Sequence, residues 1–483
     1  MGYLTCLVLF PSAAAALAAI VPSDRWRPWL LPLGSATHLA LVMGALSTAD
    51  VPPEWHRWLV LDPPGKVFLL AISVLHLMCM LYAPGYLALR RERPNRVLCV
   101  CMLLALAMMS LVVLSHHLGL MWVAVEATTL VSAPGLYFNH NVRSLEATWK
   151  YLLICSVGIA LALLGSLFLA YSAIHGGLAP TLLFHELLEP DVAHGLSRPW
   201  LHAAFILLLV GYGTKMGLSP MHTWKPDAYG EAPGIVGALL AGAATSCVFL
   251  AVVRIYQIAV AGGEGDFASK VMIFMGLLSM ATAAVFMVRQ RDFKRLLAYS
   301  SVEHMGILVF GLGVGGSLAL FGTLLHVINN AMTKGVLFLA AGNIHRAYGS
   351  KLTDDVAGAM RALPLSGSLF LFGFLAGCGS PPFSPFASEF SIVSGAFADG
   401  HYLAAALFLV ALLAVFVGMG GTVLSVVLGE PSRARAKSSF PDGLRTGAPI
   451  VGLMVIVVWF GVRLPPFLAN LLDEAVRSLA PLG

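Results

Sequence analysis

The chain has 483 residues, of which 58% are hydrophobic and only 11% are charged, and its mean hydropathy is +0.85. A soluble globular protein of this length needs more polar surface than such a composition supplies, so that class is excluded. The composition predicts an integral membrane protein. Its net charge of +5 is explained by loops beside a lipid bilayer and does not indicate nucleic-acid binding.

Apolar stretches of roughly 20 residues, the length that crosses about 30 Å of hydrocarbon, recur along the whole chain. We expect about fourteen transmembrane helices, which predicts an all-α integral membrane protein with a single membrane domain. The first stretch resembles a secretory signal peptide, but it lacks a basic amino-terminal region, so we interpret it as a helix. The expected spans are residues 2–21, 29–48, 67–88, 97–115, 118–138, 151–174, 200–224, 233–253, 270–288, 296–315, 318–344, 364–398, 402–429 and 447–468.

Twenty of the 29 lysines and arginines fall in alternate short loops, and the loops of the opposite side hold only seven. By the positive-inside rule, the richer loops face the cytoplasm. This predicts a multi-pass protein of the bacterial or archaeal cytoplasmic (inner) membrane, with both termini outside. The basic loops contain residues 25–27, 90–96, 143–150, Lys225, 289–295, 346–361 and 433–445.

Ionisable residues in the middle of apolar spans indicate function, because a charge at the bilayer centre costs about 2.5–3.5 kcal/mol. Glu126 lies in the fifth stretch, either in a proton path or as a protonated structural acid. Lys215 lies in the seventh, too far from either end for its side chain to reach the interface. Gly217 and Pro220 interrupt this span after the lysine, and His222 follows, either as a helix-end cap or as a functional group.

The tenth and eleventh stretches also carry polar groups. Glu303 could serve a proton path or form a structural ion pair with nearby Lys294 and Arg295, and the adjacent His304 could serve packing or function. In the eleventh stretch, His326, Asn330 and Lys334 are spaced four residues apart and share nearly one helix face. Hydrogen bonding between helices would explain His326 and Asn330, but it would not explain a lysine.

The twelfth stretch repeats the arrangement of the seventh, because Glu389 follows predicted helix breaks at Pro381, Pro382 and Pro385. Broken helices must line a polar cavity or be buried in protein, since lipid cannot satisfy the freed backbone groups. The two breaks fall at matching points of two five-helix units, which predicts inverted repeats like those of secondary transporters. The expected parts are residues 1–96 (helices 1–3), 97–262 (helices 4–8), 263–430 (helices 9–13) and 431–483 (helix 14).

Spaced acids, lysines and histidines in a dry interior are suited to passing protons through intervening water. Glu126 and Lys215 are the candidates for a coupled pair of this kind. The seven cysteines lie in apolar segments without a CxxC pair, so we expect no cofactor, metal or disulfide in this chain. The glycine run at 310–316 ends a membrane helix, which argues against a dinucleotide-binding loop.

Four segments carry a family resemblance: FNHNVRSLEATWKYLLICSVGIALALLG, GYGTKMGLSPMHTWKPDAYGEAP, RDFKRLLAYSSVEHMGIL and LHVINNAMTKGVLFLAAGNIHR. They resemble the antiporter-like proton-pumping subunits shared by respiratory complex I, multisubunit sodium/proton antiporters and membrane-bound hydrogenases, with hydrogenase-4 component F as the nearest branch. The resemblance covers roughly residues 60–430. It implies a fold with broken helices seven and twelve and a hydrophilic axis along the membrane plane.

The resemblance also implies residue roles. Glu126 matches the family's helix-five glutamate and Lys215 its helix-seven lysine. His326 and Lys334 match helix-eleven positions, and Glu389 matches the terminal group in helix twelve.

Two positions depart from the family. Ser246 stands where many members have a lysine or histidine in helix eight, so a central relay there would need water or Lys334. Asn330 replaces a second histidine of helix eleven.

These observations predict a proton-translocating membrane subunit of a redox-driven respiratory or hydrogenase complex. Its expected partners are other membrane subunits and a peripheral redox arm on the cytoplasmic side, and those partners would carry any iron–sulfur or nickel–iron centres. One alternative is a subunit of a multisubunit sodium/proton antiporter that is independent of electron transfer. Another is a structural scaffold whose relay residues are vestigial.

Overall fold

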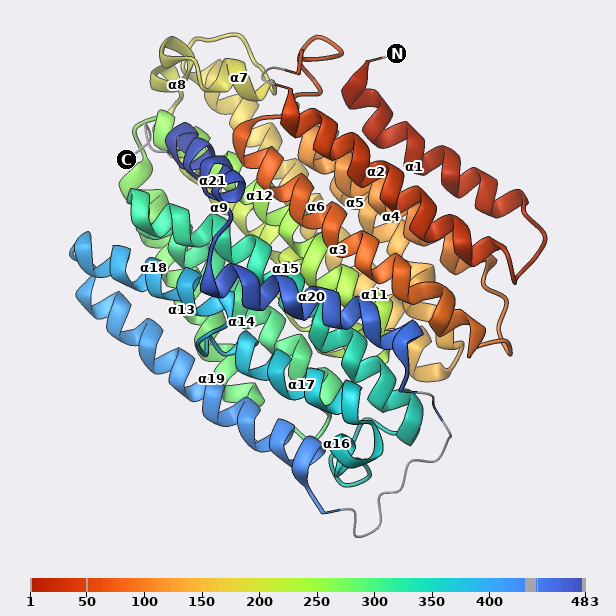
Figure 1. Cartoon of the computed structure of the whole chain (residues 1–483). Coiled ribbons are helices and arrows are strands. Elements are labelled where there is room, and N and C mark those ends of the chain that lie inside the picture. Colours follow the sequence, from red (N-terminus) through yellow and green to blue (C-terminus); the bar gives the residue numbers. More distant parts are fainter. Residues whose placement is uncertain (1, 49–50, 431–439, 441, 480–483) are drawn as a thin grey trace.

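The computed structural model describes residues 2–48, 51–430, 440 and 442–479 of the chain. Helices joined by short connections make up this part, with only isolated β-bridges among the described residues, which confirms the all-α class (Figure 1). Within the same residues, twelve helices are long and apolar enough to cross a membrane. Most of the expected basic loop 433–445 lies outside the described residues.

Six expected spans in the first part of the chain each correspond to one helix. Local sequence explains several starts: Asp62 caps the third helix by accepting a hydrogen bond from the Gly65 amide at 3.0 Å. Asn141 and Ser144 form a capping box at the sixth. The helices are α1 (Tyr3–Ile20), α2 (Leu30–Ser47), α3 (Pro63–Ala88), α4 (Arg96–Leu114), α5 (Leu118–Leu136) and α6 (Val142–His175).

The seventh and twelfth expected spans are each divided into two helices. A glycine adopts the left-handed conformation in each break, with φ 77° at Gly217 and 62° at Gly379. The four pieces are α9 (Arg198–Met216), α10 (Trp224–Glu231), α17 (Pro364–Gly377) and α18 (Ser384–Ala398).

The prolines of the two breaks do not all behave as expected. Pro220 lies in the irregular stretch after α9, and Pro381 and Pro382 lie in the one after α17. Pro385, expected as a third break, lies instead in the first turn of α18. Proline is compatible with that position because the first amide groups of a helix have no partner within it.

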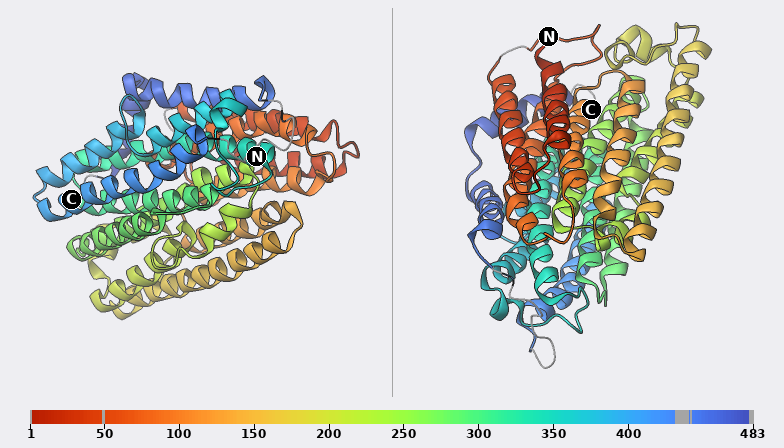
Figure 2. Two further views of the ribbon diagram at one scale, coloured as in Figure 1. Left: turned by 90° about the horizontal axis from the view of Figure 1, so that it is seen from below. Right: turned by 90° about the vertical axis from the view of Figure 1, so that its right-hand side faces the viewer.

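Three spans form the buried centre of the bundle. They are α11 (Gly234–Leu239), which continues through a π-helical segment (Leu240–Ala244) into α12 (Thr245–Ala261), then α14 (Phe293–Val314), and α15 (Ser317–Tyr348). In an apolar segment of 18 residues from each of these spans, 100%, 94% and 100% of the residues are buried, against 28% in the outer helix α19 (Tyr402–Leu428). The central helices therefore lie among other helices (Figure 2), where polar groups can be held in a membrane.

The other helices surround this centre. The short α7 (Phe184–Leu187), α8 (Pro190–Gly195) and α16 (Ala359–Ala362) lie in connections, whereas α13 (Gly265–Met287) and α20 (Leu444–Val462) are membrane spans. The hydropathy pattern did not predict α21 (Pro466–Leu479). It places Leu468, Leu472 and Ala475 on its buried side and packs against α3 and α15.

A buried arginine ties three helices together near one face of the bundle. Arg254 of α12 is 1% exposed and donates hydrogen bonds to the carbonyl oxygens of Val113, at 2.7 Å, and Ser115. It also pairs with Asp62 at 3.2 Å, and His116 lies 3.4 Å from the same carboxylate. Burial opposes ionisation of Asp62, but Arg254 and His116 together hold the pKa of this carboxyl well below its ordinary value.

We expect Arg254→Ala to lower the free energy of unfolding by about 3–5 kcal/mol, because it leaves the Asp62 carboxylate buried without its main partner. Denaturant titration in mixed micelles would measure the loss. The exposed Arg57 is the control, and Arg57→Ala should change stability by less than about 0.5 kcal/mol. Equal losses in the two variants would contradict the anchoring role.

Candidate functional site

The Lys215 ammonium group lies in a pocket of hydroxyl groups. Lys215 is in the last turn of α9 and 3% exposed, and its Nζ donates hydrogen bonds to Tyr151 Oη at 2.6 Å and Thr129 Oγ1 at 2.8 Å. Thr129 donates to the Glu126 carboxylate at 3.2 Å, and Ser156 donates to it at 2.6 Å. The expected pair is therefore linked through the Thr129 hydroxyl, and no direct Lys215–Glu126 ion pair forms in the described part of the chain.

Other segments of the chain provide hydrogen-bond partners for several polar groups at the break after α9, but His222 Nδ1 has none among the described residues. Trp224 Nε1 donates to the carbonyl oxygen of Thr214 at 2.8 Å. The Ser219 amide donates to Ser279 Oγ of α13 at 3.0 Å. His222 is buried within the break, and α10 begins without a capping side chain. Backbone groups freed by the break therefore find partners within the protein, although Pro220 and Thr223 are exposed.

Lys225 is wholly buried in α10, which corrects its expected position in a cytoplasmic loop. Its Nζ donates to Ser301 Oγ of α14 at 3.0 Å. Its methylene groups pass over Gly217, where a Cβ would lie 2.4 Å from Lys225 Cδ and Cε. Cys155 lies within electrostatic reach of both Lys215 and Lys225. The break thus brings a second lysine to the same region.

A third lysine approaches the same turn of α14. Lys334 of α15 is wholly buried, and its Nζ donates to Ser300 Oγ at 2.6 Å. Ser300 and Ser301 are consecutive, so they hold the ammonium groups of Lys334 and Lys225 beside one turn of helix. The two lysines are close enough to interact electrostatically. The three buried lysines therefore form a series that crosses the centre of the bundle.

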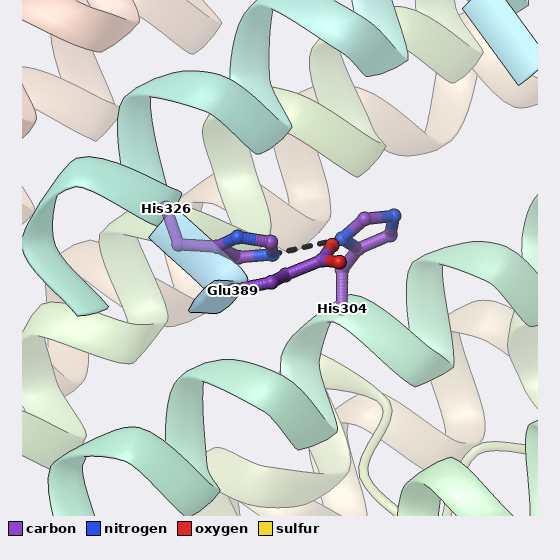
Figure 3. A group of neighbouring side chains, drawn as sticks. All are labelled: His304, His326 and Glu389. Atoms are coloured by element: carbon purple, nitrogen blue, oxygen red, sulfur yellow. Dashed lines mark hydrogen bonds between the residues drawn. The ribbon is translucent and has the colours of Figure 1, made fainter. Parts of the chain in front are cut away.

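Two histidines and a glutamate converge beyond Lys334 (Figure 3). Nδ1 of His304 and Nε2 of His326 are 2.9 Å apart, and Nδ1 of His326 is 2.9 Å from Ser388 Oγ. The Glu389 carboxylate reaches the two rings from α18. One potential ligand atom from each of His304, His326 and Glu389 lies within 4.8 Å of the others.

Further polar groups near this cluster make no hydrogen bond to the protein. Both carboxylate oxygens of Glu303 are buried and unpaired, with Lys334 within electrostatic reach. The alternative ion pair with Lys294 or Arg295 is wrong for the described residues, because those cations bind elsewhere. The side-chain amide of Asn330 is also unpaired, so hydrogen bonding between helices explains His326 but not Asn330.

Ser246 is less well connected. It is wholly buried in α12, and its hydroxyl donates to the Gly242 carbonyl of its own helix at 2.7 Å. Within the described residues, no hydrogen bond joins it to Lys215, Lys225 or Lys334. Ser246, which stands where many family members have a lysine or histidine, thus bonds the backbone of its own helix.

A polar cavity of about 750 Å³ opens at one end of the bundle. The carbonyl of Ala232, which lines it, accepts a hydrogen bond from Lys294 Nζ at 2.5 Å. The cavity lies at the start of α11 and α14 and near the end of α15, among the basic residues of loops 90–96, 143–150, 289–295 and 346–361. Its charged lining consists of Arg90, Arg143, Glu231, Arg291, Asp292, Arg295, Arg346 and Lys351.

Known proteins match this chain in sequence. Residues 115–415 match the transmembrane family described as NADH:quinone oxidoreductase/Mrp antiporter. A hydrogenase-4 component F homolog of Methylacidiphilum infernorum is 34% identical over 95% of this chain and 96% of that protein. NADH-quinone oxidoreductase subunit N of Desulforudis audaxviator is 30% identical over 98% and 92%. The family resemblance of the sequence motifs is therefore confirmed.

Solved structures match the fold over nearly the whole chain. A chain of the Mrp complex from Dietzia sp. DQ12-45-1b superposes with a TM-score of 0.86 at 21% identity, covering 99% of this chain and 98% of that one. A chain of respiratory complex I from Thermus thermophilus has a TM-score of 0.82 at 22% identity, covering 99% of both. At these identities the likeness establishes the fold.

The contact between Gly217 and Lys225 can be tested with a matched glycine. Gly217→Ala should lose about 1–2 kcal/mol from its left-handed backbone and about 1–3 kcal/mol more from crowding the lysine stem. Gly177→Ala should lose only the first part, because Gly177 has φ 80° and nothing within 4 Å of its Cβ position. Denaturant titration of both variants would give the difference, and equal losses would mean that the lysine does not need this space.

Proposed function

The chain belongs to the NADH:quinone oxidoreductase/Mrp antiporter transmembrane family, and on that premise we propose that it translocates protons as a membrane subunit of a redox-driven respiratory or hydrogenase complex. One observation carries the proposal. Lys215, Lys225 and Lys334 are 3% exposed or less and stand in series across the bundle, followed by the cluster of His304, His326 and Glu389. Buried ionisable groups in a membrane protein are costly, and they mark ion pathways.

The proposed transfer begins at Glu126 and Lys215. A change in a neighbouring subunit shifts the hydrogen bonds through Thr129, which alters how strongly the Glu126 carboxylate favours the charged form of Lys215. When this support weakens, Lys215 releases its proton toward Lys225. The proton moves through water, because each of the two ammonium groups binds hydroxyl groups and no hydrogen bond joins Lys215 to Lys225 among the described residues.

Lys225 and Lys334 make the central step of the path. Two buried ammonium groups beside one helical turn repel each other, so protonation of one favours release from the other. This order lets a proton arrive at Lys225 as another leaves Lys334. Ser246 remains a candidate along the path, but the lysine in α10 supplies the proton-holding group that serine cannot.

Beyond Lys334 the path continues through Glu303, Asn330 and the histidine pair to Glu389. The unpaired oxygens of Glu303 and the amide of Asn330 offer the several polar partners that an ordered water needs. His304 and His326 share a hydrogen bond along which a proton can pass. Glu389 exchanges the proton with the outer side. On the cytoplasmic side, His222 in the break and the basic cavity are the candidates for proton supply.

We assign the two half-paths to the two five-helix units, residues 97–262 and 263–430, arranged as inverted repeats. The matching breaks after α9 and α17 support this division, since each stands beside ionisable residues in the middle of the bundle. Each unit then opens to one face of the membrane. Residues 1–96 and 431–483 flank the pair.

The names of the relatives support a role within a larger assembly, since they are components of a hydrogenase and of an NADH-quinone oxidoreductase. The partners would be further membrane subunits and a peripheral redox arm that carries iron–sulfur or nickel–iron centres. We place the chain in the bacterial or archaeal cytoplasmic (inner) membrane. The excess of basic residues in alternate loops supports termini on the outer side.

A sodium/proton antiporter subunit is the second candidate, because the chain also matches one of the Na(+)/H(+) antiporter subunits of Alkalihalophilus pseudofirmus at 27% identity over 58% of its length. Imidazole nitrogens favour the proton over sodium, since hard cations prefer oxygen ligands. Purification of the native complex separates the candidates. Redox subunits that co-purify favour the first, and small membrane subunits alone favour the second.

Replacing Lys215 tests the proposed path. Lys215→Ala should lower proton translocation in sealed vesicles at least about 100-fold, the usual contribution of a positioned proton-transfer group. Assembly, followed on native gels, should persist. Lys270→Ala removes an exposed lysine and should leave translocation unchanged. Normal translocation by Lys215→Ala would refute the assignment.

Substitutions at Lys225 separate charge from proton transfer. Lys225→Met keeps the apolar stem but cannot hold a proton, whereas Lys225→Arg keeps the charge but cannot release one. Both variants should therefore lose translocation to a similar extent, at least about 100-fold. If arginine restores translocation, Lys225 acts only as a fixed charge.

A further inference from the structure

We propose that His304, His326 and Glu389 bind one zinc-class transition-metal ion, and that this ion competes with the proton for the histidine pair. The binding half of this inference stands on the geometry of the three side chains. The competition half rests on the proposed proton path. The two halves are therefore tested separately below.

The two facing histidine nitrogens share one hydrogen bond, and a metal ion can take the place of its hydrogen. Nδ1 of His304 and Nε2 of His326 are 2.9 Å apart, so their lone pairs can meet only if a shared proton or a metal ion lies between them. Zinc–nitrogen bonds of about 2.0–2.1 Å at a tetrahedral centre set the two nitrogens about 3.3 Å apart. A metal therefore requires the rings to separate by only a few tenths of an ångström.

Glu389 supplies the third ligand. Its carboxylate lies beside the contact between the two rings, and its Oε1 is buried without a hydrogen-bond partner (Figure 3). An unpaired buried carboxylate oxygen is costly in a membrane protein. A metal ion bound between the rings would satisfy it. Two histidines and a glutamate, with a fourth position left for water, are a known ligand set for zinc.

An outer contact holds His326 in a suitable form, whereas Nε2 of His304 has no hydrogen-bond partner in the described part of the chain. Ser388 Oγ is 2.9 Å from Nδ1 of His326, so that nitrogen can donate its proton to the serine and leave Nε2 free for a metal. The charged groups within electrostatic reach of the cluster are Lys334 of α15, Lys225 of α10 and Glu303 of α14. The carboxylates of Glu303 and Glu389 offset part of the positive charge of the two lysines and the ion.

The break between α17 and α18 brings the cluster close to the surface of the chain. Glu389 lies directly beneath it, since a Cβ on Gly379 would stand 2.1 Å from the Glu389 Oε2 atom. Pro381 and Pro382 of the same break are exposed. A single layer of backbone therefore separates the cluster from the surface of the chain.

The ligand chemistry selects the class of metal. Magnesium and calcium require six or more oxygen ligands, and sodium is likewise a hard cation, so two imidazoles suit none of them. Zinc and cobalt(II) accept two nitrogens and one oxygen with an open position. A bound ion would occupy the lone pairs that carry the proton, and translocation would stop while it remained.

Metal counting on the full-length chain in detergent tests the binding half. After chelator treatment and gel filtration, added zinc should bind as one equivalent that is at least about 100-fold weaker in His304→Gln, His326→Gln or Glu389→Gln, because even outer-shell changes cost about 10–100-fold. His76→Gln is the matched control, since His76 is a buried histidine that bonds Ser35 at 2.9 Å outside the cluster. Undiminished binding in all three variants, or none in the wild type, would overturn the site.

Zinc-edge X-ray absorption on the wild type keeps the test decisive if the variants fold poorly. Two imidazole shells and an oxygen shell are expected. A sulfur ligand, or an all-oxygen shell, would overturn the assignment.

Proton uptake in vesicles tests the competition half, with zinc added or withheld. Loss of uptake at the zinc concentration that fills the site supports it. Stoichiometric binding without inhibition would keep the metal site but remove the cluster from the proton path. If no zinc binds while Lys215→Ala still abolishes translocation, the proposed function survives and this inference fails.

Discussion

A lysine can remain inside a membrane only if neighbouring helices give its ammonium group hydrogen-bond partners. In this chain each of the three central lysines donates a hydrogen bond to at least one hydroxyl group. Lys215 binds Thr129 and Tyr151, and the other two bind consecutive serines of α14. A hydroxyl group stabilises the ammonium without neutralising it. On the proposed path this lets the proton leave more readily than from a direct ion pair with a carboxylate, which would favour the charged lysine.

The architecture follows from this need for polar neighbours. Helices that carry such groups must be enclosed by protein. In the spans α11–α12, α14 and α15, 94–100% of the residues in an apolar segment of 18 residues are buried. The helices around them, such as α19, carry apolar surfaces suited to lipid. The bundle thus has a polar centre and an apolar exterior, whereas a soluble protein has the opposite arrangement. In both cases, the groups at the surface match the solvent that surrounds them.

Sequence alone predicted the parts of the site that interrupt an apolar run. Lys215, Lys334 and Glu389 stand out because hydrophobic residues flank each on both sides. Lys225 does not, since the apolar run ends at the break before it, and hydropathy cannot distinguish a chain that leaves the membrane from one that stays buried. The bridging role of Thr129 was also hidden, because hydroxyl residues are common in spans. Helix α21 was not predicted for a third reason, because its charged face lowers its mean hydropathy.

The two helix breaks solve one problem in the same way. Each uses a left-handed glycine, and in each an ionisable side chain lies against the space where a Cβ would be. Gly217 leaves room for the stem of Lys225, and Gly379 leaves room for the carboxylate of Glu389. Any other residue would collide there and would also strain the backbone. The breaks therefore do more than free backbone groups, because they let an ionisable side chain cross the gap in the helix and reach the polar centre of the bundle.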